Sequence, residues 1–346
     1  MIGLPATSAD RHRARPVDIV AIGEAMIEFN QASDGDGRTY LQGFGGDTSN
    51  ALIAAVRQGA TGGYVTKIGD DEFGRMCLQL WSDEGIDTLG VTIDSAAPTG
   101  IYFVRHGKEG HTFSYLRAGS AASRVQPSDV PRQLIDRAKF LHVSGISQAI
   151  SASATETVFH AIRVARETGV KVAYDPNLRL KLWPLDRARE VILATIPQVY
   201  CFLPSLDDVR LISGLDDPVA ILDWCHRQGA RTVVLKLGRD GSLASDGNRR
   251  TPISAFPVAA VDATGAGDCF DGSFLARLAA GDDVFSAARW ASAAAALTTT
   301  GYGAVAPLPT AEQVTRFMKA ALSLHRRDPA ENIPAPPDEP EKPTPR

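Results

Sequence analysis

The chain has 346 residues, of which 44% are apolar and 22% are charged, and its net charge is −4. This length and composition are typical of one large globular domain or two smaller ones. The charge balance and the lack of a long apolar run predict no nucleic-acid partner and no membrane span.

Both ends of the chain have the composition of tails. Residues 1–15 are polar and basic without an apolar core of signal-peptide length, and residues 326–346 are rich in proline and charge. Such segments bury too little apolar surface to fold, so we expect both to be disordered. The folded domain is therefore predicted to span residues 16–325. Four dispersed cysteines without metal-ligand spacing predict reduced thiols in a cytoplasmic protein.

Short β-rich runs alternate with longer helical patterns along this domain. Strands are predicted at 17–23, 62–69, 139–146, 171–177, 199–205 and 232–238. Helices are predicted at 48–59, 71–85, 152–168, 186–195, 206–213, 218–228, directly after Asp268, and at 283–299. This alternation predicts an α/β fold in three layers, with a mainly parallel central sheet and helices on both faces.

One region departs from the alternation. Residues 92–117 contain two β-like runs separated by "HGKEG", which is a hairpin signal, and another β-like piece lies at 24–41. We expect a small β-sheet formed from about 24–44 and 92–118. It would act as a lid over the carboxyl ends of the strands, where open α/β sheets bind ligands.

The segment "VDATGAGDCFDGSF" at 261–274 places glycines between a β-like run and a helical pattern. Gly265, Ala266 and Gly267 would lie at the helix N-terminus, where free N–H groups and the helix dipole attract anions. Asp268 has two interpretations. It is either a favourable first-turn carboxylate, or a base that takes a proton from a hydroxyl while the amides hold developing phosphate charge.

A second glycine turn, "FGGDTSN", occupies residues 44–50. The pair Gly45-Gly46 lets the backbone approach a ligand closely. Asp47, Thr48 and Asn50 then offer polar groups at a helix start. A capped strand-to-helix turn explains the same pattern without a ligand.

Two further segments follow predicted strands. In "YDPNLRLKLW", Asn177 and Arg179 lie at a strand end, where an arginine suits a carboxylate or phosphate, unless it is a solvated surface residue. In "KLGRDGS", Lys236, Gly238 and Gly241 would approach a nucleotide or form a hairpin turn. There is no P-loop and no GxGxxG after the first strand, which disfavours a dinucleotide oxidoreductase.

Together these motifs resemble the PfkB (ribokinase-like) carbohydrate kinases. The segment 262–268 is similar to the second family signature, and Gly45-Gly46 with Asn50 and Gly59 to the first. The resemblance covers nearly all of 17–320. Within the family, the chain looks most like the 2-keto-3-deoxygluconate kinases. That likeness runs through "IGEAMIEF", "FGGDTSN", "TGIYFVR", "FSYLRAGSA", "FLHVSGIS", "YDPNLRLKLW" and "PSLDDVRLI".

The resemblance implies a ribokinase-like fold and ATP-dependent phosphorylation of a sugar hydroxyl with Mg²⁺; a monovalent cation is compatible with the family pattern. Asp268 would be the catalytic base, with the amides of Gly265, Ala266 and Gly267 as an anion hole. The implied substrate residues are Gly45, Gly46, Asp47, Thr48, Asn50, Tyr102, Tyr115, Arg117, Arg179 and Asp268. The implied ATP residues are Asn177, Arg179, Lys236, Gly238, Gly241, Gly265, Ala266 and Gly267.

Two departures from the family pattern bear on the metal and the substrate. Ser205-Leu206-Asp207-Asp208 stands where members often carry Asn-x-x-Glu, so Asp208 would act on the metal through water. No acidic residue occurs at 300–304, where some relatives contact the substrate. Family lids often pair between subunits, which implies a homodimer or higher oligomer.

Two tyrosines and two arginines at substrate positions suit a sugar acid, because its carboxylate needs donors. The predicted reaction is therefore phosphorylation of 2-keto-3-deoxygluconate to its 6-phosphate, with the gluco or galacto epimer left open. Another PfkB kinase acting on fructose or a related ketose is the alternative. A non-catalytic sugar or nucleotide sensor is disfavoured by the intact Gly-Ala-Gly-Asp.

Overall fold

The computed structural model describes residues 16–32, 37–107 and 110–325. The predicted tails, 1–15 and 326–346, lie outside these residues. Within them, a nine-stranded sheet has the order β13-β12-β11-β10-β9-β8-β1-β4-β5. Its strands are β1 (Val17–Ile22), β4 (Gly62–Gly69), β5 (Asp87–Asp94), β8 (Ala138–Ser144), β9 (Lys171–Asp175), β10 (Cys201–Phe202), β11 (Thr232–Lys236), β12 (Ser242–Ser245) and β13 (Arg250–Ile253). All neighbours pair in parallel except β11–β12 and β12–β13. The predicted mainly parallel sheet is confirmed.

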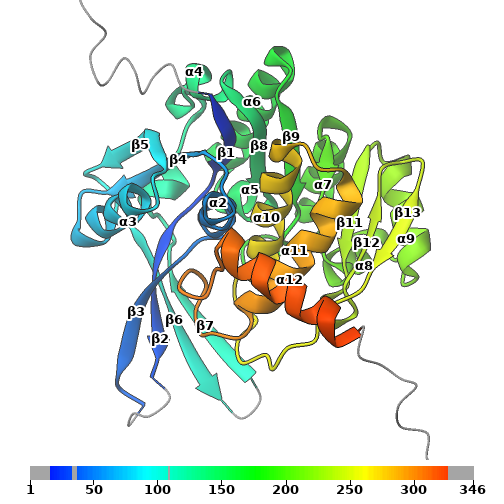
Figure 1. Cartoon of the computed structure of the whole chain (residues 1–346). Coiled ribbons are helices and arrows are strands. Elements are labelled where there is room, and N and C mark those ends of the chain that lie inside the picture. Colours follow the sequence, from blue (N-terminus) through cyan, green and yellow to red (C-terminus); the bar gives the residue numbers. More distant parts are fainter. Residues whose placement is uncertain (1–15, 33–36, 108–109, 326–346) are drawn as a thin grey trace, which may run out of the picture.

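Helices cover both faces of this sheet, which confirms the three-layer prediction (Figure 1). Successive strand residues point to opposite faces, so in β1 Ile19 and Ala21 enter one core and Val20 and Ile22 the other. The first core is covered by α2 (Asp47–Arg57), α3 (Glu72–Asp83), α10 (Ala266–Ala280), α11 (Val284–Thr298) and α12 (Ala311–His325). The second is covered by α4 (Arg132–Ile135), α6 (Ala152–Thr168), α7 (Leu185–Thr195), α8 (Leu206–Ser213) and α9 (Pro218–Arg227), with α5 (Gly145–Ala149) packed beside α6.

A second, four-stranded sheet projects from this body with the order β3-β2-β6-β7 (Figure 1). It is built from β2 (Met26–Gln31), β3 (Tyr40–Gly45), β6 (Gly100–Gly107) and β7 (Gly110–Leu116). We call it the small sheet. Residues 92–94, which the sequence assigns to this appendage, instead lie in β5, because β5 pairs with β4 at the edge of the large sheet.

Several elements are not foreseen by the sequence pattern. They are α4, α5, α12, β5, β12 and β13, and the strand predicted at 199–205 shortens to β10. The residues Ser242–Ser245 have little β-preference of their own and form a strand because they pair with β11. Pro252 lies in the edge strand β13, where the missing N–H is tolerated.

One close helix contact positions the region described next. Gly272 of α10 lies against the backbone of α2, so that a Cβ at this position would be 1.9 Å from the carbonyl oxygen of Ala51. Only glycine permits this approach. It brings the first turn of α10 beside the first turn of α2. In the described part of the chain, no helix has both the length and the apolarity that crossing a bilayer requires.

Candidate active site

The glycine turn at 262–268 is held in place from both sides. Asp262 is buried, and its carboxylate accepts hydrogen bonds from the N–H and hydroxyl of Thr264 at 2.9 and 2.7 Å and from the Gly303 N–H at 2.9 Å. Gly265 caps α10 with φ +75°, and a Cβ there would lie 2.9 Å from the Ala304 carbonyl oxygen. The turn therefore needs glycine for both conformation and space. The Ala266 N–H donates to Ala263 O at 3.2 Å, so this amide is engaged within the turn.

Asp268 lies in the first turn of α10, and its environment gives it the character of a base. Asn50 Nδ2 donates to its Oδ2 at 2.8 Å. Burial and then the negative charge of Asp47 raise the pKa of Asp268 to about 7, against the lowering effects of Asn50 and Lys236. A carboxylate with a pKa near neutrality is matched to proton abstraction at physiological pH.

The turn that begins α2 faces Asp268. Gly46 has φ +114°, and a Cβ there would lie 2.2 Å from Glu24 O, so the turn passes directly over the β1–β2 connection. Asp47 accepts from its neighbour Thr48 N at 2.8 Å and from Asn177 Nδ2 at 3.2 Å. At Gly45, a Cβ would collide with the Tyr102 hydroxyl, 2.2 Å away.

Thr48 differs from its predicted role. Its side chain is fully buried, and its hydroxyl lies 3.1 Å from that of Tyr64 in the core between α2 and β4. The side chain is therefore not exposed to a substrate, because the helical turn after Gly46 directs it inward. The hydroxyl takes part in a buried contact with Tyr64. The capping pattern was the only feature of the local sequence that suggested an inward position.

The small sheet contributes two tyrosines to the same region. Tyr102 and Tyr115 are opposite each other in β6 and β7, with ring centroids 5.7 Å apart. Tyr102 is buried and donates to Glu28 Oε2 at 2.5 Å, whereas Tyr115 is 39% exposed. The cationic groups of Arg179 and Arg117 both lower the pKa of Tyr115 against the larger raising effect of burial. Four of the predicted substrate residues, Tyr102, Tyr115, Arg117 and Arg179, are thus brought together.

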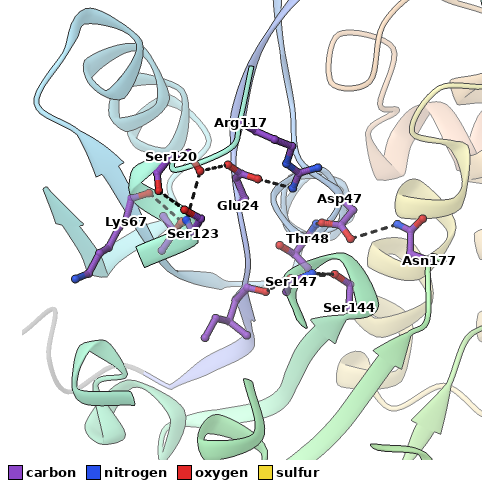
Figure 2. Close-up of polar contacts among 12 residues, drawn as sticks. Glu24, Asp47, Thr48, Lys67, Arg117, Ser120, Ser123, Ser144, Ser147 and Asn177 are labelled. Carbon is purple, nitrogen blue, oxygen red and sulfur yellow. Dashed lines mark hydrogen bonds and ion pairs between the residues drawn. The ribbon is translucent and has the colours of Figure 1, made fainter. Parts of the chain in front are cut away.

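Arg117 is not a free cation. It forms a buried ion pair with Glu24, and Ser120 Oγ donates to Glu24 Oε1 at 2.5 Å (Figure 2). Burial raises the pKa of Glu24, and the Arg117 cation opposes this effect. Arg117 Nε is buried and makes no hydrogen bond to the described residues. Glu24 and Glu28 were missed by the sequence reasoning, although both lie in "IGEAMIEF".

The predicted nucleotide residues lie at the adjoining strand ends. Asn177 has φ +33°, and it bridges two elements through its N–H to Asp175 Oδ1 at 3.1 Å and its side chain to Asp47. Gly238 and Gly241 flank the hairpin turn between the antiparallel strands β11 and β12, and their approach to a nucleotide stays a prediction. A Cβ at Gly241 would lie 2.1 Å from Ile253 O, which explains this glycine by packing.

Asp208 is the one predicted metal residue. It lies in the first turn of α8, and Ser205 accepts its N–H at 3.1 Å. Burial, and then the charge of Asp175, raise the pKa of Asp208 to about 6. Within residues 16–32, 37–107 and 110–325, no three His, Cys, Asp or Glu side chains form a metal-binding group. Mg²⁺ is often held by one or two carboxylates together with substrate phosphates, so a single carboxylate here fits that mode.

The family is settled by comparison with known proteins. The family model described as "pfkB family carbohydrate kinase" matches residues 17–311. The chain belongs to the PfkB family of carbohydrate kinases. It is 36% identical to a 2-dehydro-3-deoxygluconokinase of Thermoproteus tenax over 88% of this chain and 95% of that protein. It is 32% identical to Fructokinase-1 of Oryza sativa subsp. japonica over 88% of this chain and 98% of that protein.

A solved structure agrees with this membership. The crystal structure of a fructokinase from Vibrio cholerae, with fructose, ADP and a calcium ion bound, superposes with a TM-score of 0.79 at 28% identity. The superposition covers 87% of this chain and 99% of the fructokinase chain. The ribokinase-like fold expected from the sequence is therefore confirmed, and the chain is a sugar kinase by family.

Proposed function

We propose that this PfkB kinase transfers the γ-phosphoryl group of ATP to the 6-hydroxyl of 2-keto-3-deoxygluconate. The observation that carries the proposal is the convergence of Tyr102, Tyr115, Arg117 and Arg179 near the base. The charges of Arg179 and Arg117 both act to lower the pKa of Tyr115, and the Arg117 guanidinium lies 5.7 Å from the Tyr115 ring centroid. Donors of this kind suit a carboxylate, which a neutral ketose lacks.

The proposed chemistry is an in-line phosphoryl transfer. Asp268 takes the proton of the sugar hydroxyl, the hydroxyl oxygen attacks the γ-phosphorus in line, and the bond to the bridging oxygen breaks to release ADP. The amides of Gly265, Ala266 and Gly267 face the phosphoryl oxygens as negative charge develops there. Ala266 is the weakest of the three donors, since its N–H is shared with Ala263.

We assign the ATP side of the site to Asn177, Arg179, Gly238 and Gly241, with Lys236 behind them. Asp208 would hold Mg²⁺ through water, and the ion would neutralise phosphate charge when bound. A monovalent cation is retained as a second ion of the reaction.

Other features belong to the same proposal. The four cysteines are free thiols, which supports a reducing cytoplasm. Leu41 and Leu116, in the outer strands of the small sheet, are each 64% exposed, which supports pairing of two lids in an oligomer.

The similarity to fructokinases supports a second candidate, a ketose kinase. One coupled assay of ADP release tests both. The purified chain receives ATP and Mg²⁺ with 2-keto-3-deoxygluconate, its galacto epimer, fructose or ribose in turn. We expect kcat/KM to be highest for the acids. A preference for fructose overturns the sugar-acid assignment. If no sugar causes ADP release, the result favours the non-catalytic sensor.

A further inference from the structure

The ammonium group of Lys236, at the end of β11, lies between two buried carboxylates. Nζ donates to Asp175 Oδ2 at 3.0 Å and to Asp271 Oδ1 and Oδ2 at 3.0 and 3.1 Å. The side chains of Lys236, Asp175 and Asp271 are 13%, 7% and 1% exposed. Asp175 ends β9, and Asp271 follows Asp268 by three residues in α10. The ammonium therefore ties two strand ends to the beginning of α10.

The same group lies directly beneath the glycine turn. A Cβ built at Gly267 would be 3.8 Å from Lys236 Nζ. An ammonium has three N–H donors, and three carboxylate oxygens within 3.1 Å already accept them. Binding a phosphate directly would require Lys236 to leave two buried carboxylates without their cation, which is costly.

We propose that Lys236 is a positioning residue that acts through Gly267 and Asp268, and that its fixed charge, rather than a contact with the nucleotide, is its contribution to the reaction. The inference rests on the proposed function, because it requires Asp268 to be the base. The positive charge of Lys236 stabilises the carboxylate form of Asp268, and the negative charge of Asp175 opposes it. The two charges therefore have opposite effects on the pH at which the base becomes active.

The other charged groups near Asp268 come from several elements. Asp47 of α2 raises the pKa of Asp268, and Tyr102 of β6 interacts with it from the small sheet. His142 of β8 faces Asp175 and Lys236, and burial lowers its pKa to about 4, so it stays neutral near pH 7. Asp175 and Asp271 both contact Lys236. Substitutions at these three residues change the charge behind the turn without removing a proposed substrate contact.

The test is the pH dependence of kcat/KM for the sugar in two variants with opposite expectations. Lys236→Met removes the cation and keeps a side chain of similar length. The acid limb of its profile, where kcat/KM falls at low pH, should move to higher pH by about one unit. Asp175→Asn removes the anion and leaves Lys236 paired with Asp271, so its acid limb should move to lower pH. In both, the KM for ATP should stay within about twofold, as expected when a side chain makes no nucleotide contact.

Each failure has a distinct meaning. A tenfold or larger rise in the KM for ATP in Lys236→Met with an unmoved acid limb makes Lys236 a nucleotide contact and overturns the inference. An unmoved or raised acid limb in Asp175→Asn also overturns it, and this variant serves even if Lys236→Met does not fold. Asp268→Asn is measured alongside, because normal turnover there would sink the proposed function itself rather than the role of Lys236.

Discussion

Asn50 donates a 2.8 Å hydrogen bond to Asp268 across 218 residues of sequence. The two side chains come from the first turns of α2 and α10, which pack together at Gly272 and Ala51. The family's two glycine motifs thus form one site, in which the first motif orients the base supplied by the second.

Replacing the base is the most direct experiment. Asp268→Asn keeps the shape of the side chain but cannot accept the hydroxyl proton, so kcat should fall about 10²–10⁴-fold. Binding of sugar and ATP, measured by calorimetry, should change little. The matched control is Asp186→Asn, the same substitution at an exposed residue of α7, which should retain full turnover. A similar kcat in both variants would contradict the assignment.

The Asn50 hydrogen bond predicts a shift in the pH profile. The pKa of about 7 places the acid limb of wild-type kcat/KM near neutrality, with activity rising as Asp268 loses its proton. Asn50 stabilises the charged form, so in Asn50→Ala the pKa should rise and the limb should move to higher pH. Asn248→Ala, on the exposed β12–β13 turn, should leave the limb in place. A limb that moves to lower pH in Asn50→Ala would refute this electrostatic role.

The close contact between α2 and α10 should be intolerant of a methyl group. Gly272→Ala places Cβ 1.9 Å from Ala51 O and must push the helices apart, lowering both stability and kcat. Gly281→Ala at the far end of α10 meets nothing within 4 Å and should cost only about 1 kcal/mol for its positive φ. Urea unfolding and turnover of the two variants give the comparison. Equal unfolding midpoints would show that α10 shifts without penalty.

Arg179 tests carboxylate recognition because its side chain is exposed and, among the described residues, hydrogen-bonds to its neighbour Leu178 O. The KM for ATP is measured beside it, because Arg179 is also assigned to the ATP side. Arg179→Ala should raise the KM for sugar acids at least about tenfold, the loss expected for a charge-assisted hydrogen bond, and affect fructose much less. Arg187→Ala, on the surface of α7, controls for the general loss of a positive charge. Parallel losses for acid and neutral sugars would point away from the carboxylate.

Arg117 must be tested together with Glu24. Removing Arg117 alone leaves a buried carboxylate uncompensated, which typically costs about 3–5 kcal/mol. We expect Arg117→Ala to lower the free energy of unfolding strongly, and Glu24→Gln/Arg117→Ala to recover part of it. The double variant should still discriminate less well between acid and neutral sugars. Discrimination as in the wild type would assign Arg117 a structural role only.

Much of the site could be predicted because its signals are local. A strand, two glycines and a polar helix start are adjacent in sequence, so "FGGDTSN" and "DATGAGD" predict turns whose amides and side chains reach the same edge of a parallel sheet. Thr48 shows the limit of this reasoning. Its position in the motif is correct, but only the rotation of α2 about its axis directs the hydroxyl to Tyr64.

The partners of the charged residues could not be predicted. Nothing near Lys236 in sequence indicates Asp175 or Asp271, and nothing near Arg117 indicates Glu24. Hydrophobic periodicity and turn residues are short-range properties, so they are enough to predict the strands, helices and glycine turns and the family resemblance. Whether a cation is free or compensated, and whether a carboxylate titrates near neutrality, depends on burial and on distances between separate elements. Those quantities exist only once the sheet, α2 and α10 have packed together.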